Sequence, residues 1–411
     1  MTVVDRDQHV LASRAAALDA ADPLAGFRHR FAPAEADLIY LDGNSLGRPT
    51  KAALERVCAV TEQWATRLIR GWDEGWLELP LRVGDLLASG VLGARSGEVL
   101  VTDSTTVNLY RLASAVLDAR PDRRTVLIER SEFPTDRYVL EGLARERDLE
   151  IRWLDGDPIE GLASEQVEAA LDDRTALVLL SAVNYRSSAI VDLRAITAAA
   201  RDAGGLVLWD LSHAGGSVPV DLAANGVDLA VGCTYKYLNG GPGAPAFLYV
   251  RQELQVKLRP PIQGWMAQTD QFEMGPAFRP RSGIEGWQVG TPGIIGLTAA
   301  EAGIELVAEA GIDRIRAKSV ALTSYAVELL DAWLAPLGCS LGSPRDSARR
   351  GAAIAIRHPE ARRLTEDLLA RNVVTDFRAP DSVRIGMSPL TTSFDDVARG
   401  LAAMRALLAG A

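Results

Sequence analysis

Short apolar runs alternate with longer amphipathic stretches through the middle of the chain, from about residue 82 to residue 250. Short runs of this kind are typical of strands that are buried on both faces, and the longer stretches between them have helical spacing. Such alternation predicts a mainly parallel sheet that is covered by helices. We expect strands at residues 99–101, 125–128, 176–180, 206–209, 229–231 and 246–250.

The two ends of the chain follow other patterns. An Ala-rich helical stretch over residues 11–22 ends at Pro23, and a longer helix is expected over residues 51–70. Proline and glycine interrupt residues 259–293, which predicts a long irregular segment of the functional kind. Beyond it we expect helices over residues 297–334, 359–371 and 394–408, and strands at 352–356 and 383–385.

These patterns predict two structural domains. Residues 51–296 are expected to form a large domain and residues 297–411 a smaller α/β domain, to which an N-terminal segment, residues 1–50, contributes. A chain of 411 residues with 48% hydrophobic content can bury cores of this size.

Composition narrows the possible partners and compartment. A net charge of −10 argues against nucleic acid or an anionic membrane as a partner. No apolar run approaches the roughly 18 residues that span a bilayer, and the N-terminus lacks the apolar core of a signal peptide. The three cysteines are too widely spaced for a disulfide framework or a zinc site. We therefore expect a cytoplasmic protein without a metal.

Candidate chemistry lies after two of the expected strands. Lys236 follows the strand at residues 229–231, and Asp210 ends the strand at 206–209, with His213 three residues further on. Most lysines are simply exposed. Here, however, the carboxyl ends of parallel strands meet at one edge of the sheet, where ligands collect. A lysine that holds an aldehyde and a carboxylate that holds a pyridinium nitrogen are what pyridoxal 5'-phosphate needs from a protein.

The surrounding residues resemble a known family. Trp209-Asp-Leu-Ser-His-Ala-Gly-Gly-Ser-Val-Pro-Val-Asp-Leu222 and Gly232-Cys-Thr-Tyr-Lys-Tyr-Leu-Asn-Gly-Gly-Pro-Gly243 closely resemble kynureninases, and the similarity extends from about Tyr40 to the last helix. The resemblance implies a three-layer αβα fold of the pyridoxal-phosphate-dependent transferase type (fold type I), with active sites at the interface of a homodimer. It also implies hydrolysis of L-kynurenine, or of its 3-hydroxy form, to anthranilate and L-alanine in tryptophan catabolism, the kynurenine pathway and NAD biosynthesis.

The same resemblance implies roles for individual residues. Lys236 would hold the cofactor and then take the α-proton of the substrate, Asp210 would keep the ring nitrogen protonated, and Tyr235 would transfer protons later or serve only as a phosphate ligand. The further cofactor-contacting positions are Thr105, Thr106, Phe133, Pro134, Thr135, Asp136, Ser181, His213, Trp265 and Thr291, of which Trp265 and Thr291 would reach the phosphate across the dimer interface. The substrate positions are Asn44, Ser45, Trp72 against the aryl ring, and Arg384 at the carboxylate.

Several of these residues also have simpler explanations. Thr105 and Thr106 open a helix after the strand at residues 99–101, where hydroxyl side chains are usually caps. The same helix N-terminus can equally bind a phosphate. Phe133 and Trp72 are of the type that fills cores, although a flat aromatic can also hold a cofactor ring by offset stacking. Arg384 is one of 44 cationic side chains, but a guanidinium gives the two-point contact that a carboxylate accepts.

The sequence also departs from the family. Met266-Ala267-Gln268 stands where kynureninases have an aromatic residue, glycine and histidine, and Thr391 replaces a tyrosine. Both changes concern the aryl pocket, so a related pyridoxal-phosphate lyase or transferase that acts on another β-substituted amino acid is the first alternative. A cysteine desulfurase would need a mobile nucleophilic cysteine, and none of Cys58, Cys233 and Cys339 has that setting. The second alternative is a non-catalytic cofactor-binding homologue.

Overall fold

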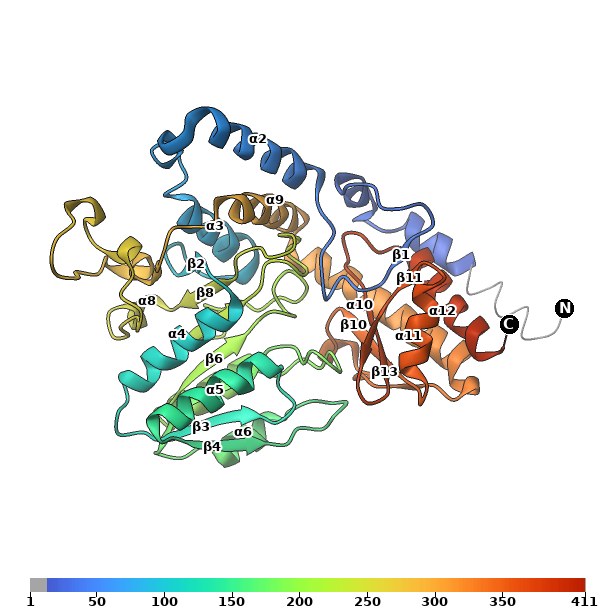
Figure 1. The fold of residues 1–411 in the computed structure, drawn as a ribbon. Helices are drawn as coiled ribbons and strands as arrows, with labels where there is room; N and C mark the ends of the chain where they lie inside the picture. The colour runs from blue at the N-terminus through green and yellow to red at the C-terminus, as the bar shows by residue number, and fades with distance from the viewer. Residues whose placement is uncertain (1–12, 411) are drawn as a thin grey trace.

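A seven-stranded sheet forms the centre of the larger part of the molecule, with the strand order β2-β8-β7-β6-β5-β3-β4. The computed structural model describes residues 13–410 (Figure 1). Neighbouring strands from β7 to β4 are parallel, and β8 is antiparallel to both of its neighbours. The strands are β2 (Val99–Val101), β3 (Thr125–Glu129), β4 (Glu150–Leu154), β5 (Thr175–Ser181), β6 (Leu206–Asp210), β7 (Leu229–Gly232) and β8 (Phe247–Val250).

Alternate side chains of these strands enter two separate cores. Val126 and Ile128 of β3 pack under the helices of one face, and Leu127 points to the other face. The helices α4 (Thr105–Asp118) and α5 (Pro134–Arg147) cover the first face. The second face is covered by α3 (Leu79–Leu87), α7 (Leu193–Asp202) and α9 (Ile294–Ala310). This confirms the predicted three-layer αβα fold with a mainly parallel sheet.

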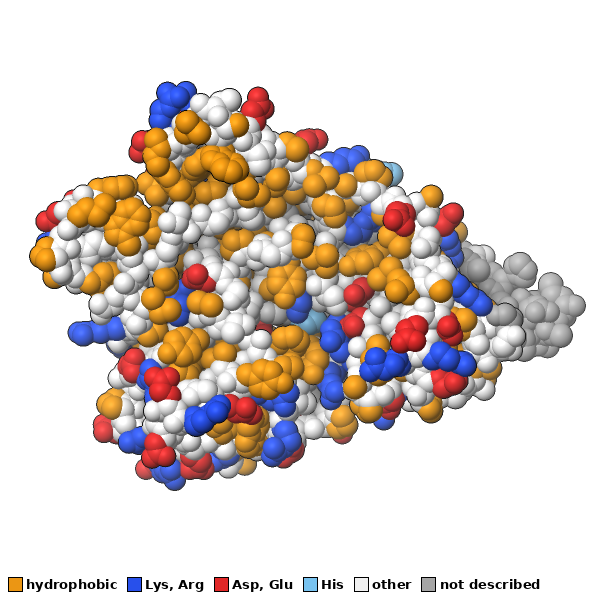
Figure 2. Space-filling view, in the orientation of Figure 1, with side chains coloured by type: hydrophobic (Ala, Val, Ile, Leu, Met, Phe, Trp, Pro, Cys, Tyr) orange, Lys and Arg blue, Asp and Glu red, His pale blue; other side chains and the backbone are white. Residues whose placement is uncertain are grey.

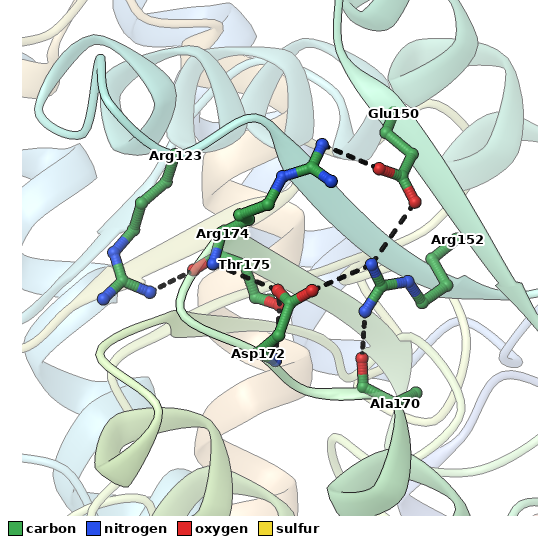
Figure 3. A network of polar contacts seen from close by, with 7 residues as sticks. All are labelled: Arg123, Glu150, Arg152, Ala170, Asp172, Arg174 and Thr175. Atoms are coloured by element: carbon green, nitrogen blue, oxygen red, sulfur yellow. Dashed lines mark hydrogen bonds and ion pairs between the residues drawn. The ribbon is translucent and has the colours of Figure 1, made fainter.

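All six predicted strands are present in this sheet, but the edge strand β4 was missed. Its residues are exposed or half-buried except for Leu154, so it lacks the apolar run by which the other strands were found. Figure 3 shows charged side chains of this strand in ion pairs: Arg152 pairs with Glu150 and Asp172, and Arg174 pairs with Glu150. Charges of this kind keep an edge strand from pairing with another chain.

The smaller part contains an antiparallel sheet with the order β12-β13-β10-β9. Its strands are β9 (Ser340–Leu341), β10 (Ala353–Arg357), β12 (Asp376–Arg378) and β13 (Ser382–Gly386). The helices α10 (Ile312–Leu329), α11 (Ala361–Leu369) and α12 (Phe394–Leu408) pack with this sheet around one core. The expected strands at 352–356 and 383–385 are therefore confirmed, whereas the short β9 and β12 were not predicted.

The N-terminal region joins this smaller core. Strand β1 (Ile39–Tyr40) pairs in parallel with β11 (Val373–Val374), and Leu41 is buried beside them. A buried ion pair of 2.7 Å joins Asp22 to Lys318 of α10. The helix predicted over residues 11–22 is present from residue 13 to residue 20, and Leu11 lies outside the described residues.

Two further features concern the expected boundaries. Helix α9 crosses the predicted division at residue 296, and its buried residues pack against the large sheet. The irregular segment is confirmed: within residues 259–293 the longest regular element is the short helical turn η6 (Gly283–Trp287).

In the described part of the chain, one helical stretch, Ile312–Leu337, is long and apolar enough to cross a membrane by length and composition. Half of its apolar 18-residue window is buried inside the protein, as expected of a core helix.

The remaining helices complete the large part. Helix α2 (Lys51–Arg67) begins at Thr50, whose hydroxyl oxygen accepts a hydrogen bond from the backbone N–H of Ala53. The helix was predicted to end at residue 70; α2 ends at Arg67, and the turn η2 (Leu68–Trp72) follows it directly. The short helices α6 (Ser164–Ala170) and α8 (Gln252–Gln255) lie between strands.

Candidate active site

A cavity of about 240 Å³ lies at the carboxyl ends of the strands of the large sheet. Its walls come from the segments that follow β2, β3, β5, β6 and β7, because parallel strands bring the residues after them to one edge. On the face drawn in Figure 2, the surface is hollowed between the large and the small part. Ten of the predicted cofactor residues line the cavity: Thr105, Thr106, Phe133, Thr135, Asp136, Ser181, Asp210, His213, Tyr235 and Lys236.

Lys236 stands four residues after β7 and is almost fully buried. Its Nζ lies 2.9 Å from Nε2 of His213. Burial, and next the charge of Lys236, hold the pKa of His213 well below its usual value. The imidazole is therefore neutral at neutral pH, and a neutral ring with an unprotonated Nε2 accepts a hydrogen bond from the ammonium. Lys236 therefore has in His213 an uncharged neighbour at a fixed position.

Asp210 is the last residue of β6, and its carboxylate accepts a hydrogen bond of 2.6 Å from the backbone N–H of Ser212. Beside it lies Asp136, whose two carboxyl oxygens are buried and accept no hydrogen bond from the described residues. Burial, followed by the negative charge of Asp210, raises the pKa of Asp136. Buried carboxyl oxygens normally have partners. Two neighbouring carboxyls with spare acceptors fit a ligand that brings a proton or a positive charge, such as a protonated pyridine nitrogen.

The N-terminus of α4 forms a second wall. Ser104 is the N-cap, and its hydroxyl oxygen accepts a hydrogen bond of 3.3 Å from the N–H of Val107. The hydroxyls of Thr106 and Thr135 lie 3.4 Å apart across the cavity wall. The first N–H groups of a helix have no partner within the helix, and together with these hydroxyls they suit a phosphate. Pro134 opens α5 and does not itself line the cavity in the described chain.

Two residues that sequence reasoning missed shape the same cavity. The carboxylate of Glu132 accepts hydrogen bonds from the N–H and the hydroxyl of Ser181, at 2.6 and 2.5 Å. Burial raises the pKa of Glu132 to about 8. Tyr185 lines the cavity and meets Phe133 edge to face, with ring centroids 5.3 Å apart. A glutamate in a turn is usually exposed, and nothing in the local sequence marks Glu132 or Tyr185 as inward-facing.

Arg384, Asn44 and Ser45 come together at the small part of the molecule. Arg384, on β13, is 2% exposed. Its Nη1 donates to the carbonyl oxygen of Tyr185 at 2.6 Å, and its Nη2 donates to the hydroxyl of Ser45 at 2.9 Å. Asn44 accepts from Nε at 2.7 Å when its amide oxygen is turned toward the guanidinium, the orientation that satisfies both of its polar atoms. In the described chain Arg384 does not line the cavity; it lies behind Tyr185.

Trp72 lies apart from this cavity. It lines a second, apolar cavity of about 380 Å³, which shares Gly243 with the first. Trp64 and Trp76 form other walls, and the indole N–H of Trp76 is already bonded to Gln63. The lining residues of this second cavity are Val60, Trp64, Trp72, Trp76, Gly243, Pro245, Gly293, Ile294, Ile295 and Gly296.

Trp265 and Thr291 line neither cavity in the described residues of one chain. Trp265 is 47% exposed, and its indole N–H donates to the carbonyl oxygen of Gln271. Thr291 is exposed as well. A single chain therefore brings together the predicted lysine, carboxylate and helix N-terminus, but not these two positions.

Comparison with known proteins gives consistent matches. Residues 315–404 match a family model described as the kynureninase C-terminal domain. The kynureninase of Pseudomonas fluorescens is 42% identical over 389 residues, which cover 93% of this chain and 91% of the relative. The kynureninase of Burkholderia pseudomallei is 42% identical over 402 residues, which cover 96% and 94%.

Solved structures with the same fold are more distant in sequence. The apo cysteine desulfurase of Thermococcus onnurineus superposes with a TM-score of 0.81 at 19% identity, covering 91% of this chain and 96% of the other. A variant of C-DES, with glycine covalently linked to its pyridoxal-phosphate cofactor, gives a TM-score of 0.82 at 18% identity and covers 92% and 98%. At these identities the matches establish the fold alone.

Proposed function

The chain belongs to the kynureninase family, and we propose that it hydrolyses L-kynurenine to anthranilate and L-alanine with Lys236, Asp210 and Tyr235 as its catalytic residues. The observation that carries this proposal is the cavity in which a buried lysine, a neutral imidazole and spare carboxyl oxygens lie at one sheet edge. Pyridoxal 5'-phosphate is the cofactor, and when bound it supplies an electron sink for charge that develops at the substrate's α-carbon. The reaction belongs to tryptophan catabolism.

Lys236 has two tasks in this proposal. Its Nζ would hold the cofactor at the aldehyde carbon, and it would accept the proton from the substrate's α-carbon. The hydrogen bond to His213 supports both tasks, because a neutral acceptor 2.9 Å away orients Nζ without placing a positive charge beside it. A positively charged imidazole would instead repel it.

Asp210 and Tyr235 act on different protons in the proposed reaction. Asp210, fixed by the N–H of Ser212, holds the proton at the ring nitrogen of the cofactor. Burial, the largest cause, raises the pKa of Tyr235, so the phenol stays protonated at neutral pH and can donate a proton. After water has added to the γ-carbonyl and the Cβ–Cγ bond has broken, the alanine side needs such a donor at Cβ.

The remaining cavity residues bind the cofactor. The N-terminal N–H groups of α4, with the hydroxyls of Thr105, Thr106 and Thr135, suit the phosphate. Phe133 offers its ring face to the pyridine, and its contact with Tyr185 fixes its position. The N–H and the hydroxyl of Ser181 donate to Glu132, and Ser181 forms the cavity wall beside Asp210.

The substrate is proposed to extend in two directions from this cavity. Its carboxylate binds Arg384 beside Asn44 and Ser45, and its aryl ring enters the apolar cavity at Trp72. That cavity has no polar side-chain group other than indole N–H among its lining residues. An apolar wall favours L-kynurenine over its 3-hydroxy form, because a buried hydroxyl without a partner costs free energy.

A homodimer in the cytoplasm completes the proposal, with Trp265 and Thr291 reaching the partner's cofactor phosphate. Large apolar side chains exposed on one chain support it, and Figure 2 shows apolar surface over α2, where Leu54 and Trp64 lie. Leu68 and Ile69, which directly follow α2, are exposed as well. Exposed apolar surface of this extent is typical of an interface.

Turnover tests the function directly. Purified holoenzyme with L-kynurenine should release anthranilate and L-alanine in equal amounts. A change in the cofactor's visible spectrum without products would favour a non-catalytic homologue, and turnover of a different β-substituted amino acid would favour a related lyase or transferase. Cysteine desulfurase chemistry has less support, because none of the three cysteines lines the cavity in the described chain.

Mixing variants tests the dimer. Lys236→Ala and Trp265→Ala subunits, each inactive or nearly so alone, should regain activity when they are dissociated and reassembled together. Each mixed dimer then contains one site with both wild-type residues. Recovery would not occur if Trp265 served the site of its own chain, and a monomer in sedimentation would exclude the arrangement altogether.

A further inference from the structure

Three charged side chains form a connected group behind the cofactor cavity. Asp376 of β12 stands directly opposite Arg384 of β13 in the antiparallel register. Its Oδ2 lies 2.5 Å from Nη2 of Arg384 and 2.8 Å from Nε of Arg378. One carboxylate is thus shared by two guanidiniums, one of them fully buried and the other one-third exposed.

This sharing leaves Arg384 with little free binding capacity. A guanidinium has five N–H donors in a fixed plane. Those of Arg384 donate to the carbonyl oxygen of Tyr185, the hydroxyl of Ser45 and the amide oxygen of Asn44, and Nη2 is also ion-paired with Asp376 without a hydrogen bond to it. An incoming carboxylate that contacts Nη2 therefore meets the negative charge of Asp376 at the same nitrogen.

We propose that Arg378 is a positioning residue for the substrate carboxylate: it takes over Asp376 when the substrate binds, and so frees Arg384. The inference rests on the proposed role of Arg384 as the carboxylate anchor. Two guanidiniums then face the carboxylates of Asp376 and of the substrate, and Asp42 is a further carboxyl on which the charges of both arginines act.

The surroundings of Arg378 suit this task. Its guanidinium carbon lies 5.8 Å from the ring centroid of Tyr185, and that ring meets Phe133 in the cavity wall. Arg378 is therefore next to the part of the cavity wall that Tyr185 forms. The side chain of Arg378 is one-third exposed and so can move more easily than that of Arg384, which is held on three sides by protein groups.

Charge explains why the second arginine is needed. Without Arg378, the only cationic partner left to Asp376 in this group is Arg384, at 2.5 Å. Asp376 would then compete with the substrate carboxylate for the same N–H groups in a place where water screens little. Substrate binding should weaken, while the chemistry at Lys236 should proceed as before.

Steady-state kinetics of the Arg378→Gln holoenzyme tests the inference. We expect KM for L-kynurenine to rise at least about tenfold, with kcat within about threefold of wild type, since only carboxylate binding is affected. Arg378→Lys, which keeps the charge, should recover part of the loss. Arg378→Gln combined with Asp376→Asn should bring KM back toward wild type, because the competing charge is gone.

Product binding gives a second readout. The dissociation constant of L-alanine, measured through the visible spectrum of the bound cofactor, should change in step with KM in each variant. Arg186→Gln is the matched control: Arg186 also lies over the Tyr185 ring, at 5.9 Å, but bonds to the carbonyl oxygen of Ala379 and not to Asp376. It should leave KM and L-alanine binding unchanged. Thermal melting of each variant checks folding.

The outcomes distinguish the role of Arg384 as carboxylate anchor from the role of Arg378 as positioning residue. If Arg384→Lys leaves KM and L-alanine binding unchanged, Arg384 is not the carboxylate anchor and the proposed substrate site is wrong. If Arg384→Lys weakens both but Arg378→Gln does not, only the role of Arg378 is overturned. A double variant that binds as poorly as Arg378→Gln alone overturns it too, since competition by Asp376 would then not explain the loss.

Discussion

The cofactor end and the aryl end of the proposed site are built in different ways. Every wall of the cavity at Lys236 comes from segments that follow the strands of one sheet, and ten of the predicted residues meet there. The aryl end is an apolar cavity at Trp72, lined by α2, the turns that follow it and the start of α9. A single sheet edge assembles the cavity at Lys236, whereas the aryl cavity depends on helices and loops outside the sheet.

The first prediction concerns the residue on which the cofactor end depends most. Lys236→Ala should lose the covalent attachment of the cofactor and reduce kcat by several orders of magnitude, because one side chain supplies both attachment and base. Borohydride reduction followed by mass spectrometry should find the cofactor on wild-type Lys236 and on no residue of the variant.

The chain offers clear controls for this experiment. The three other lysines are Lys51, Lys257 and Lys318. Lys257→Ala, at an exposed position, should keep both the adduct and the activity. An adduct on a different lysine, or a Lys236→Ala protein with wild-type turnover, would remove the basis of the proposed site.

The second prediction concerns the opposite wall of the same cavity. Asp210→Ala should bind the cofactor weakly and turn over at least about a hundredfold more slowly, because breaking a buried charge pair costs about 3–5 kcal/mol. Fluorescence titration of the apoprotein with cofactor measures binding, and steady-state kinetics measures turnover. Activity within a few fold of wild type would mean that another group, with Asp136 the nearest carboxyl, holds the ring nitrogen.

The sequence predicted which residues meet at this sheet edge for a physical reason. Lys236, Asp210 and Ser181 each end or follow a strand, and apolar runs locate strands, so their meeting at one edge follows from parallel pairing. The six predicted strands of the sheet are all present. Strand β4 was missed because an edge strand with charged side chains has no apolar run.

Other parts depend on contacts that no local pattern records. Glu132 reaches Ser181, 49 residues away, and Arg384 meets Ser45 across 339 residues. Asp376 was not predicted at all, because its two-residue spacing to Arg378 is unremarkable until β12 pairs with β13. The sequence departure at Gln268 has a structural explanation: its amide oxygen accepts a hydrogen bond from the N–H of Arg279 and so holds the irregular segment.

The third prediction tests the aryl end through its substrate preference. We expect a higher kcat/KM for L-kynurenine than for 3-hydroxykynurenine. A ring hydroxyl in the apolar cavity at Trp72 would lack a good partner, at a cost of about 1–3 kcal/mol, or roughly 5- to 150-fold. Competition between the two substrates in one reaction measures the ratio. A preference for the hydroxylated form would mean that a polar group, such as Thr291 of a second chain, reaches the ring.

The last prediction returns to the cofactor end and is the smallest in size. Burial raises the pKa of Glu132 from 4.5 to about 8, with the charges of Glu129 and Asp210 acting in the same direction and the hydrogen bonds from Ser181 opposing it. Between these two values the folded protein keeps a proton on Glu132 that the unfolded chain has lost. The unfolded state therefore binds fewer protons, and stability falls as pH rises through this window.

Replacing Glu132 with glutamine should remove this part of the pH dependence. The amide is nearly isosteric, and its oxygen can still accept from the N–H of Ser181 while its NH2 meets the hydroxyl. The melting temperature of the wild-type holoenzyme should fall more steeply from pH 5 to pH 8 than that of Glu132→Gln, whereas Glu168→Gln, at an exposed position on α6, should follow wild type. Parallel curves for wild type and Glu132→Gln would mean that Glu132 is ionised in the folded protein. The surroundings of Ser181 would then carry more negative charge than the raised pKa of Glu132 implies, and Asp210 would have to hold the ring nitrogen near a second ionised carboxylate.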